Sequence, residues 1–258
     1  MMPATRAGVP SRDLDWEPCW NVRDLGGLPL SGGGETRWGA LIRADCLGKL
    51  TTAGRQALID YGVGNVQAFL NMFKRLGVEV CRASTPEALQ QASHLILPGV
   101  GAFDHAMTQL QQSGLRPALE ALVLERKIPV LGICVGMQML ASGSDEGRLP
   151  GLNWVPGRVK AFAQHPDLQA LPMPHMGWND VQFRAGHPLF RDFEAASRYY
   201  FLHSYYFDAQ DKADVVATAE YGIDFDCIVS RGNVHGIQCH PEKSHRFGAQ
   251  FLKNFAAL

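Results

Sequence analysis

A cysteine and a histidine–glutamate pair are the residues of this chain best suited to covalent chemistry. Cys134 lies in LGICVGMQ at 131–138, and His240 and Glu242 lie in VHGIQCHPE at 234–242. A thiol becomes a strong nucleophile when a neighbouring base takes its proton, and a carboxylate can fix the tautomer of that base. We therefore predict a catalytic triad in which Cys134 attacks, His240 transfers protons and Glu242 orients His240.

The residues around Cys134 predict a sharp turn between a strand and a helix. IPVLGI at 128–133 is apolar and typical of a buried strand, and VGMQML after the cysteine is typical of a helix. Gly132 and Gly136 flank the cysteine as Gly-x-Cys-x-Gly, the spacing of a nucleophile elbow, where side chains beside the nucleophile have no room. On composition alone an inert core cysteine would be favoured, but the two glycines favour the catalytic interpretation.

A second glycine-rich turn could stabilise the oxyanion that forms when a thiol attacks a carbonyl. LILPGVGAF at 95–103 predicts a buried strand followed by a turn that begins near Gly99. The backbone N–H groups of Val100 and Gly101 could point outward from this turn, and that of Val135 would be a further donor. A turn with two glycines is often only a turn, so this interpretation depends on the cysteine nearby.

Strands and helices alternate along most of the chain, which predicts an α/β fold with a mostly parallel open sheet and helices on both faces. In NVQAFLNMFKRLG, Asn65 is a candidate N-cap, apolar residues recur at helical spacing and Gly77 supplies the stop. VEVC and HLILP follow as strands, with a short helix at PEALQQA between them. Sites in such sheets form beyond the carboxyl ends of strands, which is where Cys134 and His240 are expected.

The composition is that of a globular enzyme. The 258 residues are 46% hydrophobic, which is enough for a sizeable core, and a formal net charge of -1 gives no electrostatic reason to expect nucleic-acid or membrane-surface binding. No apolar run approaches the ~20 residues of a membrane span, and MMPATRAGVPSRD lacks the apolar segment of a secretory signal. We therefore expect a cytoplasmic protein.

The cysteines and histidines do not predict a metal site. The six cysteines show neither zinc-site spacing nor the density of a disulfide framework, so reduced thiols are expected. His235, Cys239, His240 and His245 lie close together in sequence, but strand alternation places His235 and Cys239 on the face opposite His240. No metal and no cofactor is predicted.

Seven motifs together resemble a known family. In chain order they are IDYGVGNV, LPGVGAF, LGICVGMQML, VPGRVKAF, PHMGWND, YYFLHSYYF and GIQCHPEKS. Their order is similar to that of the class I glutamine amidotransferases, and within them to the glutaminase subunit of imidazole glycerol phosphate synthase, the HisH family. The resemblance covers about residues 57–258, roughly four fifths of the chain.

The resemblance implies that Cys134 attacks the side-chain amide of L-glutamine, that His240 protonates the departing ammonia, and that water releases glutamate from the thioester. Residues matching positions around the glutamine are Gly99, Val100, Gly101, Val135, Gln138, Ser204 and Tyr205. Residues matching positions that face a partner subunit are Asn65, His175, Trp178 and Lys243. For the tyrosines a structural role remains open, because YYFLHSYYF would serve equally well as a half-buried strand.

The resemblance also implies a partner protein. The amidotransferase motifs occupy the chain from about residue 57 onward, which leaves no synthase domain to use the ammonia. The partner implied is a HisF-like (β/α)₈-barrel cyclase in a heterodimer, with imidazole glycerol phosphate and an aminoimidazole carboxamide ribotide as products.

The first residues resemble a different family. NVRDLGGLPL, SGGGE and RWGALIRADCLGKLT are similar to the start of protein tyrosine/serine phosphatases over about residues 12–60, but the catalytic Cys-x₅-Arg loop of those enzymes is missing. We therefore expect a loosely ordered fragment at 1–56 and an amidotransferase domain at 57–258. At the junction, ALID at 57–60 is expected to be the first strand of the sheet, because the large downstream sheet should override local helix propensity.

Three alternatives stay open on the sequence. A paralogous glutaminase that feeds ammonia to an enzyme amidating a surface sugar would share the triad, since the acceptor is chosen by the partner. A thiol hydrolase of the related peptidase and chaperone kind also uses an elbow cysteine, although Gln138 and Glu242 disfavour it. A catalytically silent binding protein would keep the triad but have its entrance or first strand spoiled by the N-terminal segment.

Overall fold

The computed structural model describes residues 23–24, 28, 34–35, 42–43, 55–168, 171–193 and 197–258. The chain divides into two units, Met1–Thr52 and Ala53–Leu258. In the first unit, the strands β1 (Arg23–Asp24) and β2 (Ile42–Arg43) pair antiparallel. The prediction that the N-terminal segment is loosely ordered falls mostly outside the described residues.

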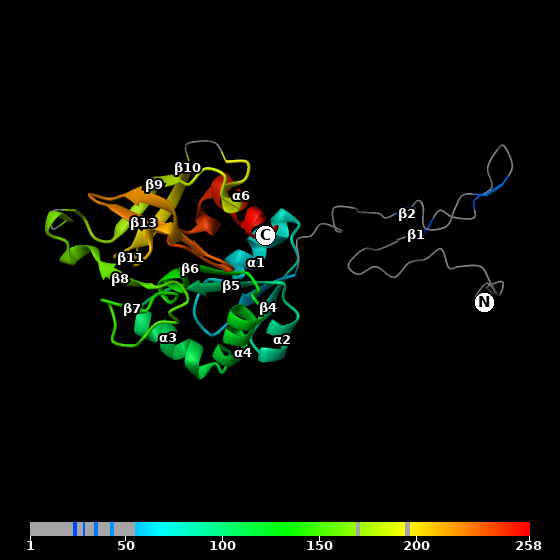
Figure 1. Ribbon diagram of the computed structural model, residues 1–258, viewed down its shortest axis with the longest axis horizontal. Helices are drawn as coiled ribbons and strands as arrows, with labels where there is room; N and C mark the ends of the chain where they lie inside the picture. The colour runs from blue at the N-terminus through cyan, green and yellow to red at the C-terminus, as the bar shows by residue number, and fades with distance from the viewer. Residues whose placement is uncertain are drawn as a thin grey trace. The chain divides into compact units, whose positions relative to one another are not determined.

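Parallel strands form the centre of the second unit (Figure 1). They are β3 (Gln56–Ile59), β4 (Val80–Ala83), β5 (His94–Gly99), β6 (Val130–Cys134) and β14 (Val234–Ile237). Their order across the sheet is β14-β6-β5-β3-β4, and all four neighbouring pairs are parallel. The strand predicted at 57–60 is found one residue earlier, as β3 at 56–59, which lies between β5 and β4 and has every residue buried.

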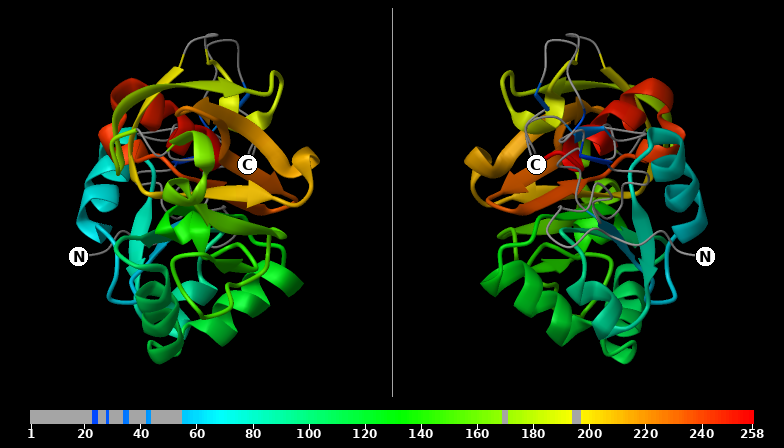
Figure 2. Two further views of the ribbon diagram at one scale, coloured as in Figure 1. Left: turned by 90° about the vertical axis from the view of Figure 1, so that its left-hand side faces the viewer. Right: turned by 90° about the vertical axis from the view of Figure 1, so that its right-hand side faces the viewer.

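Helices cover both faces of this parallel centre. Their bounds are α1 (Val66–Leu76), α2 (Pro86–Gln90), α3 (Phe103–Gln112), α4 (Arg116–Glu120), α5 (Val135–Gln138) and α6 (His245–Phe255), and a π-helical turn, Ala121–Glu125, continues α4. Figures 1 and 2 show α1 and α6 on one face and α3 and α4 on the other. The predicted α/β architecture is therefore confirmed.

The ends of α1 follow from its sequence. The Asn65 side chain accepts a hydrogen bond from the backbone N–H of Ala68 at 3.3 Å, and Gly77 ends the helix with a left-handed φ of 68°. Between them Val66, Phe69 and Phe73 recur at helical spacing and are buried against the sheet. The predicted cap, apolar stripe and stop are all confirmed.

Antiparallel strands extend the sheet beyond β14. They are β8 (Gly157–Ala161), β9 (His175–Phe183), β10 (Ser197–His203), β11 (Tyr205–Ala209), β12 (Val215–Glu220) and β13 (Asp224–Arg231). The short strand β7 (Gly143–Ser144) adds to them by pairing parallel with β8. Among the described residues the full order is β10-β9-β12-β13-β14-β6-β5-β3-β4, with β11 paired to β13 and β8, and β7 paired to β8. This extension brings β10 and β11 toward the carboxyl end of β6.

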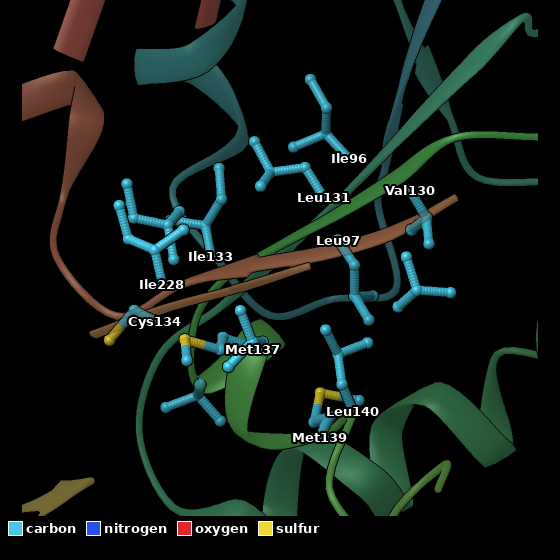
Figure 3. Packing of buried hydrophobic residues seen from close by; sticks show 14 of the residues in the cluster. Ile96, Leu97, Val130, Leu131, Ile133, Cys134, Met137, Met139, Leu140 and Ile228 are labelled. Carbon is cyan, nitrogen blue, oxygen red and sulfur yellow. The ribbon is translucent and has the colours of Figure 1, made fainter. Parts of the chain in front are cut away.

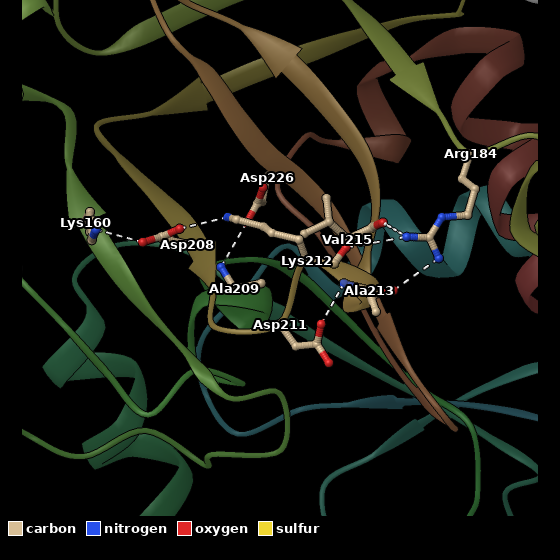
Figure 4. Close-up of polar contacts among 9 residues, drawn as sticks. All are labelled: Lys160, Arg184, Asp208, Ala209, Asp211, Lys212, Ala213, Val215 and Asp226. Atoms are coloured by element: carbon tan, nitrogen blue, oxygen red, sulfur yellow. Dashed lines mark hydrogen bonds and ion pairs between the residues drawn. The ribbon is translucent and has the colours of Figure 1, made fainter.

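A buried carboxylate joins two of the antiparallel strands (Figure 4). Asp226 on β13 has only 8% of its side chain exposed and accepts hydrogen bonds from Lys212 Nζ at 2.8 Å and from the backbone N–H of Ala209 at 2.9 Å. Lys212 also binds Asp208 on β11 at 2.9 Å, and Asp208 binds Lys160 on β8 at 2.7 Å. This chain of opposite charges holds β8, β11 and β13 in register.

The apolar core extends along β5 and β6 up to Cys134. Ile96 and Leu97 on β5 pack beside Leu131 and Ile133 on β6, all at most 2% exposed. Figure 3 shows these side chains along the strands, and the sulfur of Cys134 at the end of β6. The core therefore supports the backbone that carries Cys134.

Candidate active site

Cys134 occupies a strained turn between β6 and α5. Its backbone has φ 56° and ψ -115°, a region that side chains other than glycine rarely adopt. A side chain at Gly132 would meet the Gly136 carbonyl, and one at Gly136 would meet the Leu97 carbonyl. The predicted nucleophile elbow is present, and the glycines permit its close packing.

His240 is held beside the cysteine from two directions. Its backbone N–H donates to the Tyr200 carbonyl at 2.9 Å, and its own carbonyl accepts from the Ser244 hydroxyl at 2.6 Å. Pro241 then opens a 3₁₀ turn, Pro241–Lys243, which ends the extended backbone and brings Glu242 round to the imidazole. His240 Nδ1 lies 2.9 Å from Glu242 Oε1, and the two side chains are only 10% and 6% exposed.

The electrostatics of His240 suit a thiolate–imidazolium pair. Burial on its own lowers the pKa of His240, but the hydrogen bonds and negative charges of Cys134 and Glu242 outweigh it and raise the pKa to about 9. The hydrogen bonds and charges of Cys134 and Glu242 therefore favour the imidazolium form of His240. Such a proton can be passed to a leaving group.

A cavity of about 350 Å³ opens in front of these residues. It is lined by Val100, Gly101, Cys134, Val135, Gln138, Glu146, Pro174, Leu202, His203, Ser204, Tyr205, His240 and Lys243. Six of the seven residues predicted around the glutamine are in this lining. The seventh, Gly99, is buried behind the cavity, where a side chain would meet the backbone of Val135 and Gly136.

Glu146 is a cavity residue that the sequence did not single out. Its Oε2 accepts a hydrogen bond from the Phe103 N–H, at the start of α3, at 2.8 Å. Ser144 supports the same loop by accepting from the Glu146 N–H at 3.1 Å. A carboxylate fixed at the cavity wall is suited to an ammonium group. The only signal in the sequence was the pair of acidic residues at 145–146, eleven and twelve residues after the cysteine.

A pair of buried glutamines lies next to the Cys134 sulfur. Gln238 is fully buried, and its Nε2 lies 3.8 Å from Cys134 Sγ. Gln138 Nε2 donates to Gln238 Oε1 at 3.0 Å and lies 3.5 Å from the Tyr205 carbonyl. Because the Gln138 amide N–H groups are used internally, its Oε1 is the atom left to accept from a bound molecule.

Three of the four predicted partner-facing residues are exposed. Asn65 caps α1 at the surface, Trp178 is 40% exposed with His245 stacked on it at 5.2 Å, and Lys243 Nζ lies 5.5 Å from the Tyr200 ring. His175 differs. It is only 4% exposed, so its side chain does not reach a surface where a partner subunit could contact it.

Metal and membrane features can be stated for the described residues. Within them, no three His, Cys, Asp or Glu side chains converge as a metal site, and Cys81, Cys134, Cys227 and Cys239 are free thiols. None of their helices combines the length and apolar character needed to cross a bilayer.

The cysteine elbow, the His–Glu pair and the sheet topology define a thiol-dependent amidotransferase. The family model for class-I glutamine amidotransferases matches residues 57–257, and this chain belongs to that family. Similar solved structures include a glutamine amidotransferase at TM-score 0.60 and 20% identity, covering 79% of this chain and 99% of that one. Another glutamine amidotransferase, from Thermotoga maritima, has TM-score 0.51 and 21% identity over 77% of this chain and 80% of its own. At these identities the structures support the fold alone.

More similar sequences carry a narrower name. The chain is 55% identical over 201 residues to the imidazole glycerol phosphate synthase subunit HisH of Bdellovibrio bacteriovorus, covering 78% of this chain and 98% of that protein. It is 46% identical to the HisH subunit of Leptospira interrogans and 45% identical to HisH 2 of Pseudomonas aeruginosa, with the same coverage in each case.

Proposed function

We propose that this chain is the glutaminase subunit of imidazole glycerol phosphate synthase, which hydrolyses L-glutamine and supplies the ammonia to a cyclase subunit in histidine biosynthesis. The observation that carries the proposal is the strained Cys134 elbow, with the His240–Glu242 pair beside it, facing a cavity walled by Glu146 and Gln138. The similarity to HisH subunits over nearly their whole length supports it.

The triad performs acyl transfer in two steps. The Cys134 thiolate attacks the side-chain carbonyl of glutamine, and the N–H groups of Val100, Gly101 and Val135, which line the cavity, are the candidate donors to the oxyanion. The His240 imidazolium gives its proton to the leaving nitrogen, so ammonia departs and a thioester remains. His240 then takes a proton from water, which attacks the thioester and releases glutamate.

The cavity wall suits the amino-acid end of glutamine. Its volume of about 350 Å³ is at the lower end of the usual range for small-molecule sites, as expected for a ligand of this size. The Glu146 carboxylate and the free Gln138 Oε1 would accept from the α-ammonium group. Ser204 and Tyr205, which also line the cavity, would donate to the α-carboxylate.

A HisF-like (β/α)₈-barrel cyclase would dock over the cavity mouth. Exposed apolar side chains gather there: Val100 is at the rim, and on the adjacent β9 and β10 Met176 pairs with Leu202 and Trp178 with Tyr200. Such a patch is typical of a protein interface. Lys243 and Asn65, both exposed, would provide polar contacts at its edge. We also propose that the enzyme is cytoplasmic and that residues 57–258 form the amidotransferase domain.

The test is glutamate release measured with and without a cyclase partner and its nucleotide substrate. The wild type should turn over glutamine rapidly only in the complex, and Cys134→Ala should abolish turnover. Residues 1–54 are tested by deletion. An unchanged rate of glutamate release would show that the segment is inert, and a changed rate would show that it affects the active site or the docking of the partner. A wild type that neither releases glutamate nor accepts a covalent glutamine-analogue label on Cys134 would be a silent binding protein. If the enzyme is active but does not restore growth of a histidine auxotroph, the alternative glutaminase, which feeds ammonia to an enzyme amidating a surface sugar, would be favoured.

A further inference from the structure

Two buried histidines beside the cavity are hydrogen-bonded ring to ring. His175, the first residue of β9, and His203, the last residue of β10, are register partners in the antiparallel pair. The distance from His175 Nδ1 to His203 Nε2 is 2.9 Å, and the residues are 4% and 6% exposed. The triad chemistry uses neither ring, so two fully hydrogen-bonded imidazoles inside an apolar core call for a function of their own.

The Tyr205 carbonyl, which can only accept, fixes the tautomers of both histidines. His203 Nδ1 lies 2.8 Å from the Tyr205 carbonyl, which can only accept, so Nδ1 carries the proton. In a neutral ring Nε2 is then an acceptor, and His175 Nδ1 must donate to it. His175 Nε2 is left to accept from Asn179 Nδ2 at 3.3 Å. Every donor in the series therefore points the same way, from Asn179 toward the Tyr205 carbonyl.

The surroundings keep the two rings uncharged. Burial lowers the pKa of His175 to about 4. Burial lowers the pKa of His203 to about 3, and the positive charges of His175 and His240 act in the same direction against the bond to the Tyr205 carbonyl. The tautomer assignment, which requires neutral rings, is thus consistent with the site at neutral pH.

The series ends on a group that shapes the cavity. The Tyr205 carbonyl lies 2.8 Å from His203 Nδ1 and 3.5 Å from Gln138 Nε2. His203, Tyr205 and Gln138 all line the cavity. Moving this carbonyl would move the Gln138 amide, whose Oε1 is the atom presented to a bound molecule.

We infer that His175 and His203 are positioning residues, which form a one-directional hydrogen-bond relay that holds the Tyr205 carbonyl and the Gln138 amide in place to bind glutamine. This inference rests on the proposed glutaminase function. His203 makes the terminal contact, and His175 fixes the tautomer and orientation of His203. Neither ring touches the reacting atoms, so the relay affects how glutamine is bound rather than how the thiol reacts.

The alternative is that His175 is only a packing residue. Its ring is stacked between Tyr221, with centroids 4.1 Å apart, and Phe201, with centroids 4.9 Å apart. Two substitutions separate packing from hydrogen bonding. His175→Phe keeps an aromatic ring but has no donor, whereas His175→Asn loses the ring but can place an amide donor near the Nδ1 position.

Steady-state glutaminase kinetics with the cyclase partner bound, together with the alkylation rate of Cys134 by iodoacetamide, test the relay. We expect His175→Phe to raise KM for glutamine by about tenfold, as for loss of one buried hydrogen bond. Alkylation, which needs no glutamine site, should stay within about twofold of wild type. His175→Asn should restore KM to within about threefold of wild type.

An unchanged KM in His175→Phe, or a KM in His175→Asn as high as in His175→Phe, would overturn the relay. If His175→Phe does not fold, His203→Asn and His203→Leu take its place, because the asparagine keeps a donor for the Tyr205 carbonyl and the leucine does not. The relay requires a lower KM in His203→Asn, and equal values would refute it. A wild type without glutaminase activity would instead refute the proposed function.

Discussion

Replacing Glu242 by glutamine removes the negative charge behind His240 with little change in shape. The carboxylate accepts from His240 Nδ1 at 2.9 Å and is only 6% exposed, so water cannot replace the lost interaction. A hydrogen bond to a charged group contributes about 1.5–3 kcal/mol, which corresponds to a rate loss of roughly 10- to 150-fold. We expect kcat of the complex to fall by this factor, with KM for glutamine changed less.

The pH profile gives a second readout of the same variant. Cys134 and Glu242 raise the pKa of His240 to about 9, so the imidazolium is present below that pH and is lost above it. The glutaminase rate of the wild type should therefore fall on the alkaline side near pH 9. Removing the Glu242 charge lowers the pKa of His240, so the alkaline limb should move toward neutral pH.

The matched control is Glu79→Gln. Glu79 pairs with Arg55 at 3.2 Å, but its side chain is 50% exposed, and such surface pairs contribute little. This variant should keep the wild-type kcat and pH profile. If Glu242→Gln also kept both, the assigned role of Glu242 would be wrong.

Three further predictions concern stability. Gly136→Ala should lower the melting temperature of the protein more than Gly114→Ala. A new methyl at Gly136, in α5, would meet the Leu97 carbonyl of β5, whereas at Gly114, a turn residue with a φ of 72°, the methyl has open space and only the backbone conformation opposes it. Equal melting temperatures would contradict the packing of the elbow. Burial lowers the pKa values of His203 and His235 to about 3 in the folded protein. The free energy of unfolding should therefore be highest above about pH 6.5 and should fall toward pH 4 by up to about 1.4 kcal/mol per pH unit for each histidine. Equal urea midpoints at pH 7 and pH 5 would exclude this effect. Asp226→Ala leaves the buried backbone N–H of Ala209 without its acceptor and should lower the free energy of unfolding in urea by about 1–3 kcal/mol. An unchanged urea midpoint would show that the network in Figure 4 is dispensable.

The elbow and the cap of α1 could be predicted because their geometry is local. Gly132 and Gly136 are spaced for a turn that no larger residue permits, and Asn65 and Gly77 carry their own helix-ending chemistry. The strand β3 could also be predicted, although its local propensity was ambiguous, because a buried position between two parallel strands decided the outcome.

The place of Glu146 could not be predicted from its neighbours. Its carboxylate reaches the cavity because it accepts from the Phe103 N–H, 43 residues earlier in the chain. A contact of that kind depends on how a loop closes over α3, and no periodic pattern encodes it. Gln238 lay within a motif that the sequence analysis quoted, but its bond to the sulfur depends on the meeting of β14 and β6.

The burial of His175 was foreseeable from strand geometry. His175 and Trp178 are three residues apart on β9, and residues an odd number apart in a strand face opposite sides. With Trp178 exposed, His175 had to point inward. Matching motif positions to a family does not separate these faces, whereas the two-residue period of a strand does.

The direction of β3 has a practical consequence for engineering. The strand runs parallel to β5 and β6, so Arg55 lies at the amino edge of the sheet while Cys134 lies at the carboxyl edge. A reporter or affinity handle joined just upstream of Arg55 is thus attached on the far side from the substrate opening. Immobilising the enzyme through that position should leave the opening free for a soluble companion protein to be captured and counted.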